Sequence, residues 1–315
     1  MSSGWLDRED NLVWISSCSD YNGYGAGATK PNSNAYFRGT LDGDGYVVYG
    51  LYYPDDTKCY SSALIPLFGN GTIKNIGIKE AYIVAIDTAA GVVGITRPDS
   101  NKMKTVENCF ADDTVYAKWT DATMNGGAAG IVGYTSNGCY VHDVTIKNCW
   151  SAAKLSSAKD PNFRSNGIIG KSWDAYYTIE NCYSIGYKPF AATYGNVGSK
   201  LGASVYKNIY TDSTTAANAT YGPYTQLTTA QMTGKGALAN MPGFSSDAWY
   251  AVDGKTPFLR SYGTAIFDAN EDGKFEKASD VTALRVGLIS SPAKNGDVNK
   301  DGNIDICDLV KLSGK

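Results

Sequence analysis

One short pattern of apolar and polar positions recurs along the first two-thirds of the chain. It consists of an apolar residue, a charged residue, an asparagine and a second, often smaller apolar residue. Its five copies are IKNI, VENC, IKNC, IENC and YKNI. Their asparagines are Asn75, Asn108, Asn148, Asn181 and Asn208, so successive copies lie 33, 40, 33 and 27 residues apart. Self-similarity at such a period is typical of proteins built from stacked structural repeats.

A second pattern alternates with the first. It has a glycine at each end of two central residues, and its copies are GVVG from Gly91, GIVG from Gly130, GIIG from Gly167 and the degenerate GNVG from Gly195. Two patterns that alternate in phase indicate one repeating unit of about three short strands joined by turns, with loops that absorb the variation in length. We therefore predict a mainly β protein with a β-solenoid over the repeats.

Stacking of the repeats would bring equivalent side chains into columns. An interior apolar column is expected from the first position of the motif, and the asparagines are expected at bends, where they tolerate the left-handed conformation and their amides bond to the neighbouring repeat. Three cysteines would form a further column, either as buried small apolar residues or as a disulfide or metal site. The apolar column is Ile73, Val106, Ile146, Ile179 and Tyr206, and the cysteines are Cys109, Cys149 and Cys182.

These motifs resemble the GLUG repeat family of secreted bacterial proteins. The resemblance covers about residues 37–210, beginning at FRGTLDGDGYVVYGLYY, and residues 226–262 are similar to the segment that often closes such domains. It implies that residues 1–262 form a right-handed parallel β-helix of irregular 27–40-residue repeats, extracellular and often adhesive or carbohydrate-associated. The resemblance does not by itself imply any enzymatic activity.

The C-terminal stretch GDVNKDGNIDICDL has oxygen-bearing residues at every second position. Calcium takes six to eight oxygen ligands, and alternate positions of a tight loop turn their side chains inward. Gly302 allows the reversal that would bring the carbonyl oxygen of Asn303 to the ion. The predicted side-chain ligands are Asp297, Asn299, Asp301, Asp305 and Asp308.

A partner loop, DANEDGKFEKASDV, begins 29 residues earlier at Asp268. Its twelfth position is Ser279, and the acid comes one residue later at Asp280, so either the loop carries one inserted residue or the first site is weaker. We expect two calcium ions in all, the first held by Asp268, Asn270, Asp272, the carbonyl oxygen of Lys274, Glu276 and Asp280.

Two such loops, each followed by a helix, resemble a type I dockerin over residues 264–315. The resemblance implies a small all-α module that binds a cohesin module of a scaffoldin or cell-surface protein outside the cell, as in a cellulosome. The recognition positions of the family correspond here to Lys277, Ala278, Ile306 and Cys307, which depart from the family's usual Ser/Thr-like pair.

The composition argues against a nucleic-acid partner and a membrane span but does not indicate an activity. The net charge of −3 provides no basic excess for nucleic acid, and no apolar run approaches the length of a membrane span. No signal peptide opens the chain, so a secreted location implies that the native one is absent from this sequence. Seven cysteines without metal-ligand spacing leave the redox compartment undecided.

Three functional hypotheses remain for the repeats. The first is non-catalytic binding of a glycan or cell surface, since strand tyrosines in YGLYYPDD and DAYYTIENCYSIGY could stack on sugars or simply pack. The second is a polysaccharide lyase or glycoside hydrolase, which needs paired acid–base groups. A structural protein that assembles end to end is a third hypothesis. The catalytic candidates, each with a simpler turn, exposed-loop or ion-pair explanation, are Asp42 with Asp44, Asp112 with Asp113, Lys147 with Glu180, and His142.

Overall fold

The computed structural model describes the chain in segments. These are residues 18–19, 36–53, 60–96, 102–118, 126–135, 144–157, 165–172, 176–190, 204–216, 222–262, 277–287, 297–298, 304 and 306–313. The chain divides into two compact units, Met1–Gly43 with Val48–Leu227, and Asp44–Val47 with Thr228–Lys315. In the segments named here, no helix has the length and apolar character of a membrane span.

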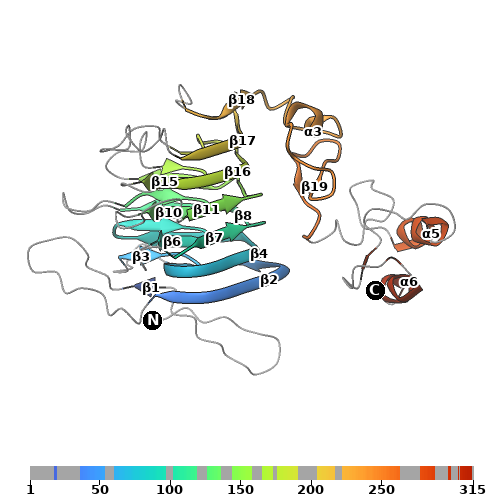
Figure 1. Cartoon of the computed structure of the whole chain (residues 1–315), viewed down its shortest axis with the longest axis horizontal. Helices are drawn as coiled ribbons and strands as arrows, with labels where there is room; N and C mark the ends of the chain where they lie inside the picture. Colours follow the sequence, from blue (N-terminus) through green and yellow to red (C-terminus); the bar gives the residue numbers. More distant parts are fainter. Residues whose placement is uncertain are drawn as a thin grey trace, which may run out of the picture. The chain divides into compact units, whose positions relative to one another are not determined.

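The first unit is built from two sheets whose strands follow the sequence repeats (Figure 1). The smaller sheet contains β1 (Cys18–Ser19), β3 (Ser61–Ser62), β5 (Thr88–Ala90), β9 (Ala128–Ala129) and β14 (Ser165–Asn166). The 13-stranded sheet contains β2 (Phe37–Tyr49), β4 (Ile65–Ala85), β6 (Val93–Thr96), β7 (Lys104–Glu107), β8 (Phe110–Ala117), β10 (Val132–Thr135), β11 (Val144–Lys147), β12 (Trp150–Ser151), β13 (Lys154–Ser157), β15 (Ile169–Ser172), β16 (Tyr177–Ser184), β17 (Val205–Asp212) and β18 (Thr225–Leu227).

Parallel pairing in the large sheet closes on itself. The ring runs β4–β7–β11–β16–β12–β8 and returns to β4, which gives a closed six-stranded parallel barrel with outer strands. The two arms of the ring meet in β4 and β16, the long strands that continue through Asn75 and Asn181. The prediction of a right-handed parallel β-helix is therefore wrong, although the mainly β composition and the parallel pairing of successive repeats agree with the structure.

The predicted apolar column is confirmed by the strand register. Ile73 pairs with Val106, Val106 with Ile146, Ile146 with Ile179, and Ile179 with Tyr206. The four aliphatic side chains are fully buried and belong to the main hydrophobic cluster of the unit. The first motif therefore marks the core-facing position of each repeat.

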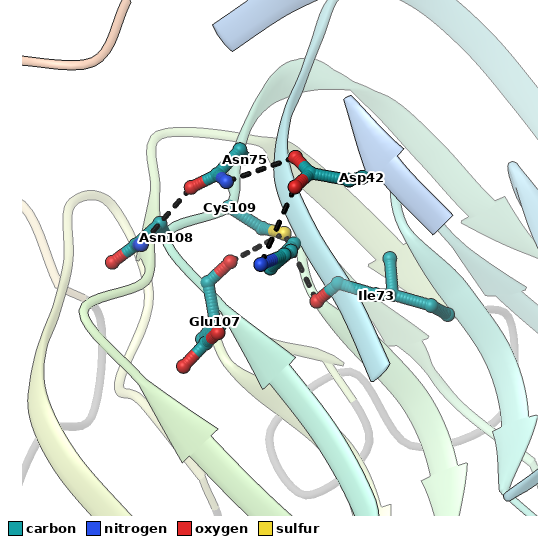
Figure 2. A network of polar contacts seen from close by, with 7 residues as sticks. Asp42, Ile73, Asn75, Glu107, Asn108 and Cys109 are labelled. Atoms are coloured by element: carbon teal, nitrogen blue, oxygen red, sulfur yellow. Dashed lines mark hydrogen bonds and ion pairs between the residues drawn. The ribbon is translucent and has the colours of Figure 1, made fainter. Parts of the chain in front are cut away.

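The motif asparagines form a continuous ladder of side-chain hydrogen bonds, as predicted. All five have φ between +50° and +54°, the left-handed conformation that asparagine tolerates better than most residues. Each Nδ2 donates to Oδ1 of the preceding asparagine over 2.8–3.2 Å, and at the end of the ladder Asn75 donates to Oδ1 of Asp42. Figure 2 shows this end, where Asp42 also pairs with Lys74 at 3.3 Å.

The glycine motif lies where two walls of the unit approach closely. A Cβ at Gly130 would be 2.1 Å from Oγ of Ser151, and one at Gly167 would be 2.4 Å from Cβ of Ser184. Neither glycine has a positive φ in the structure, so close approach and not backbone conformation requires them. The in-phase glycines thus keep a constant separation between the walls from repeat to repeat.

The described part of the second unit contains short strands, one short helix and two longer helices that share a hydrophobic cluster. Its described elements are α3 (Ala237–Asn240), β19 (Trp249–Tyr250), β20 (Phe258–Leu259), α5 (Lys277–Gly287) and α6 (Ile306–Ser313). Strands β19 and β20 pair antiparallel, and Phe244 stacks on Trp249 beside them. The small apolar cluster of α5 and α6 is separate from the core of the repeats.

Candidate functional site

The two C-terminal helices each carry an aspartate followed four residues later by a leucine. Asp280 in the first turn of α5 and Asp308 in the first turn of α6 are both fully buried. Four residues after each stands a fully buried leucine, Leu284 or Leu312, and these leucines share a hydrophobic cluster with Val298. The offset between the pairs is 308 − 280 = 28 and 312 − 284 = 28 residues. The helices are thus two copies of one packing unit.

The offset between the two aspartate–leucine pairs bears on which residue ends the first loop. The loops begin 29 residues apart, and the helices also begin 29 residues apart, at Lys277 and Ile306. The buried aspartates are 28 residues apart, so the first loop reaches its buried aspartate one residue later than the second. Its buried terminal acid is Asp280, and the preceding Ser279 is only half-buried. The burial of Asp280 is what the inserted-residue interpretation expects, and the loop before it lies outside the described residues.

Asp308 joins the end of the second loop to its beginning. Its Oδ1 accepts a hydrogen bond from the backbone N–H of Val298 at 2.7 Å, beside Asp297, the first loop residue. A buried carboxylate is stabilised by charged partners, by hydrogen bonds and by the N-terminus of its own helix. Two carboxylates at the two ends of one short loop are oxygen donors of the type that Ca²⁺ binds, so the described residues fit this ion.

Most of the predicted ligands lie outside the described residues. These are Asp268, Asn270, Asp272, Lys274, Glu276, Asn299, Asp301, Asn303 and Asp305. Among the residues that are described, no group of three or more His, Cys, Asp or Glu side chains is placed to hold a metal ion. The two calcium sites therefore stay predictions that rest on Asp280, Asp297, Asp308 and the loop sequences.

The predicted partner-binding positions fall at the starts of the two helices. Lys277 and Ile306 are the first residues of α5 and α6, and Ala278 and Cys307 are exposed. With the 28-residue offset, Ala278 and Ser279 are the equivalents of Ile306 and Cys307. The two copies therefore present different residues to any partner that contacts the helix starts.

The cysteine column is structural in character. Cys109, Cys149 and Cys182 are fully buried free thiols, and each Sγ donates to the carbonyl oxygen two residues earlier, at 3.2 Å. Figure 2 shows Cys109 directed at the carbonyl oxygens of Glu107 and Ile73. Burial raises the pKa of Cys109 and of Cys149, which keeps both as unreactive thiols. The interpretation as buried small apolar residues is confirmed.

The catalytic candidates do not assemble an acid–base pair in the described residues. Asp42 is engaged by Asn75 and Lys74 at the end of the ladder. Lys147 and Glu180 are opposite one another on adjacent strands, in register. Asp44 has a left-handed φ of 49°, and His142 lies outside the described residues.

The expected exposed loop at Asp112 and Asp113 is wrong. Both residues lie on β8, and Asp113 faces the interior, where its side chain is only 5% exposed. Among the described residues, neither carboxyl oxygen of Asp113 has a hydrogen-bond partner. Desolvation, followed by the neighbouring charge of Asp112, raises the pKa of Asp113 well above its usual value. The sequence signal for burial was alternation along FADDTVYA, where Asp113 shares the inward phase of Ala111 and Val115.

Replacing Asp113 by asparagine should change how stability depends on pH. Because its folded-state pKa is raised, the folded wild type binds more protons than the unfolded chain between the two pKa values, and its stability falls as pH rises from about 4 towards the folded-state pKa. Asp113→Asn removes this slope. We expect the urea midpoint of the variant, relative to wild type, to increase as the pH rises above about 4 and to level off once the pH exceeds the folded-state pKa of Asp113. A difference that is constant with pH would contradict the buried neutral acid.

The aromatic residues separate into a buried and an exposed group. Phe110, Trp150 and Tyr183 form a stack of nearly parallel rings with centroids 4.7 and 5.8 Å apart, in which Phe110 and Tyr183 are buried and Trp150 is half-buried. The large aromatics in the exposed group are Tyr46, Tyr49 and Tyr52, all near the end of β2. YGLYYPDD is one of the two tyrosine-rich stretches noted in the sequence. The structure shows that this stretch contains the exposed Tyr49 and Tyr52.

The chain was compared with protein-family models, curated proteins and solved structures. Neither a scan against protein-family models nor a search of the curated proteins found a match. A similar solved structure is described as a "putative immunoglobulin A1 protease" from Bacteroides ovatus, with 16% sequence identity, 70% of this chain and 77% of that chain covered, and a TM-score of 0.46. A likeness at this level carries no argument about activity.

Proposed function

We propose that this chain is an extracellular, non-catalytic binding protein with a calcium-dependent docking module at its C-terminus. The observation that carries the proposal is the duplicated pair of buried loop-end acids, Asp280 and Asp308, each four residues before a buried leucine of one shared cluster. Carboxylates in such positions are retained where a cation or hydrogen bonds compensate their burial. Calcium held by the two loops would fix the helices and the exposed residues at their starts.

The partner proposed for this module is a cohesin of a scaffoldin or cell-surface protein, as in a cellulosome-like assembly. Support comes from the dockerin-like pair of loops and from the exposed Ala278 and Cys307 at the helix starts. The chain should bind an immobilised cohesin in Ca²⁺ and be released by EDTA. Cohesins of several classes are needed, because Ile306 and Cys307 depart from the usual pair. Failure to bind any of them in Ca²⁺ would remove this partner.

For the repeats we propose presentation of a surface for glycan or cell contact. Exposed tyrosines near the end of β2 support it, and the engagement of Asp42 and the burial of Asp113 weaken the alternative of a polysaccharide lyase or hydrolase. Incubation with plant and host polysaccharides separates the two. Retention without new reducing ends or unsaturated products favours binding, and product formation would establish the enzyme.

End-to-end assembly receives no support from the asparagine ladder. At one end Asp42 only accepts hydrogen bonds when ionised, and at the other Asn208 turns its Oδ1, also an acceptor, away from the ladder. Two acceptors that meet between copies would not continue the ladder. The binding role is therefore preferred over the structural one.

A further inference from the structure

A bulge in β4 carries a backbone conformation that is unusual for its residue type. The parallel register of β4 against β8 shifts between Lys79 and Tyr82. Within the bulge, Glu80 has φ of +55°, and among the described non-glycine residues it is the only one with positive φ that is not an asparagine or aspartate. For such a residue the left-handed conformation costs about 1–2 kcal/mol, and strain of this kind concentrates at functional sites. Bulges also redirect side chains near such sites.

Exposed aromatic rings border this bulge. Tyr52 is 58% exposed and stacks on Tyr82, with ring centroids 5.8 Å apart and an interplanar angle of 27°. Tyr49, 61% exposed, precedes Gly50, whose N–H donates to the carbonyl oxygen of Lys79. By contrast Tyr53, the neighbour of Tyr52, is buried in the core. The exposure of Tyr49 and Tyr52 is therefore selective within one short segment.

The backbone holds these rings in place before any ligand arrives. The N–H of Tyr53 donates to the carbonyl oxygen of Tyr82 at 2.7 Å, and the N–H of Tyr82 donates to that of Leu51 at 2.8 Å. An exposed ring anchored on paired strands loses little conformational freedom when it binds, which favours affinity. The described backbone bridge of Tyr52 is the one to Tyr82, and its side chain is 58% exposed.

Charged residues of both signs lie in the bulge and on the strand paired with it. Glu80 is exposed, and Lys79 lies in register with Asp112 of β8, both half-buried. The carboxylates of Glu80 and Asp112 accept hydrogen bonds, and the ammonium group of Lys79 donates them. The bulge site, defined as Tyr49, Tyr52, Lys79, Glu80, Tyr82 and Asp112, thus combines flat apolar faces with hydrogen-bonding groups.

We propose that the bulge site binds neutral glycans. A pyranose ring offers an apolar C–H face for Tyr52 and neighbouring hydroxyl groups for Glu80, Asp112 and Lys79. Two carboxylates against one ammonium group disfavour uronic acid polymers, because like charges repel. This inference rests on the proposed glycan-binding role of the repeats, names the surface and the ligand class for it, and is independent of the C-terminal module.

Binding of the full-length chain to neutral polysaccharides (β-glucan, galactan, mannan and xylan) and to acidic ones (polygalacturonate and alginate) tests the proposal by affinity electrophoresis. We expect retardation on at least one neutral polymer and none on the acidic ones. Tyr52→Ala should weaken binding about tenfold or more, whereas Tyr52→Phe should keep it, since the ring supplies the stacking. Met103→Ala, which removes another exposed apolar side chain, is the matched control and should bind like wild type.

Glu80→Gly provides a second, opposed readout. Glycine adopts the positive φ without strain, so the variant should unfold a few degrees higher than wild type while it binds neutral glycan more weakly. Wild-type binding that Tyr52→Ala and Glu80→Gly both leave unchanged would overturn the bulge site but not the glycan-binding role. Absence of wild-type binding to every polymer would overturn both, and binding to acidic polymers only would overturn the ligand class.

Discussion

Asn148→Ala is expected to destabilise the repeat unit by about 3–4 kcal/mol. Its Nδ2 donates to Asn108 and its Oδ1 accepts from Asn181, so the variant loses two partly buried hydrogen bonds of about 1 kcal/mol each. Alanine at φ of +50° adds about 1–2 kcal/mol, the cost of a left-handed conformation. Urea unfolding followed by tryptophan fluorescence measures the change, because Trp150 lies in the aromatic stack of the same unit.

Asn148→Gly is the matched control for this result. Glycine adopts the left-handed conformation freely, so the variant should lose only the two side-chain hydrogen bonds, about 2 kcal/mol. The difference between the two variants isolates the backbone contribution. Equal midpoints for the alanine and glycine variants would show that the positive φ contributes nothing, and a loss below about 1 kcal/mol in both would contradict the ladder as a stabilising element.

Asp308→Asn is expected to weaken calcium binding at the second loop and, with it, calcium-dependent docking. The substitution keeps the size of the side chain but removes the negative charge of the carboxylate. That carboxylate accepts a hydrogen bond from the Val298 N–H and would face the cation. Hydrogen bonds to charged groups contribute about 1.5–3 kcal/mol, so calcium affinity of the second loop should fall by about tenfold to one hundredfold. Isothermal titration of the full-length variant with CaCl₂ gives this affinity directly.

Lys311→Ala is the control on the same helix, because Lys311 is exposed in the last turn of α6. It should leave calcium affinity unchanged within a factor of about two, as expected for an exposed surface side chain. Asp280→Asn tests the first loop in the same way. If Asp280→Asn left both titration steps intact while Ser279→Ala removed one, the loop would end at Ser279 and the inserted-residue interpretation would be wrong.

Residues whose environment repeats were predictable from the sequence. The interior column from Ile73 to Tyr206 and the asparagine ladder follow from one motif, because stacked repeats place identical sequence positions in identical surroundings. The closed ring of strands was not predictable in this way. It depends on β4, which continues through Asn75 as one 21-residue strand and pairs with both β7 and β8.

Residues that break the repeat were the hardest to predict. Asp113 occupies an interior position without a hydrogen-bond partner among the described residues, and its place on β8 depends on a register shift opposite Lys79 and Tyr82. The same bulge forces Glu80 into the left-handed region, although no glycine, asparagine or aspartate marks the position in the sequence. Local patterns carry no information about a single shifted register, since it arises from packing between strands far apart in the chain.

A calorimetric titration of the calcium-free full-length chain with CaCl₂ measures whether the paired C-terminal loops bind calcium. We expect two ions per chain, a gain of helical circular dichroism on binding, and about tenfold to one hundredfold weaker binding of one ion in Asp308→Asn. Titration without measurable heat, together with circular dichroism that is identical in Ca²⁺ and EDTA, would contradict calcium binding by these loops.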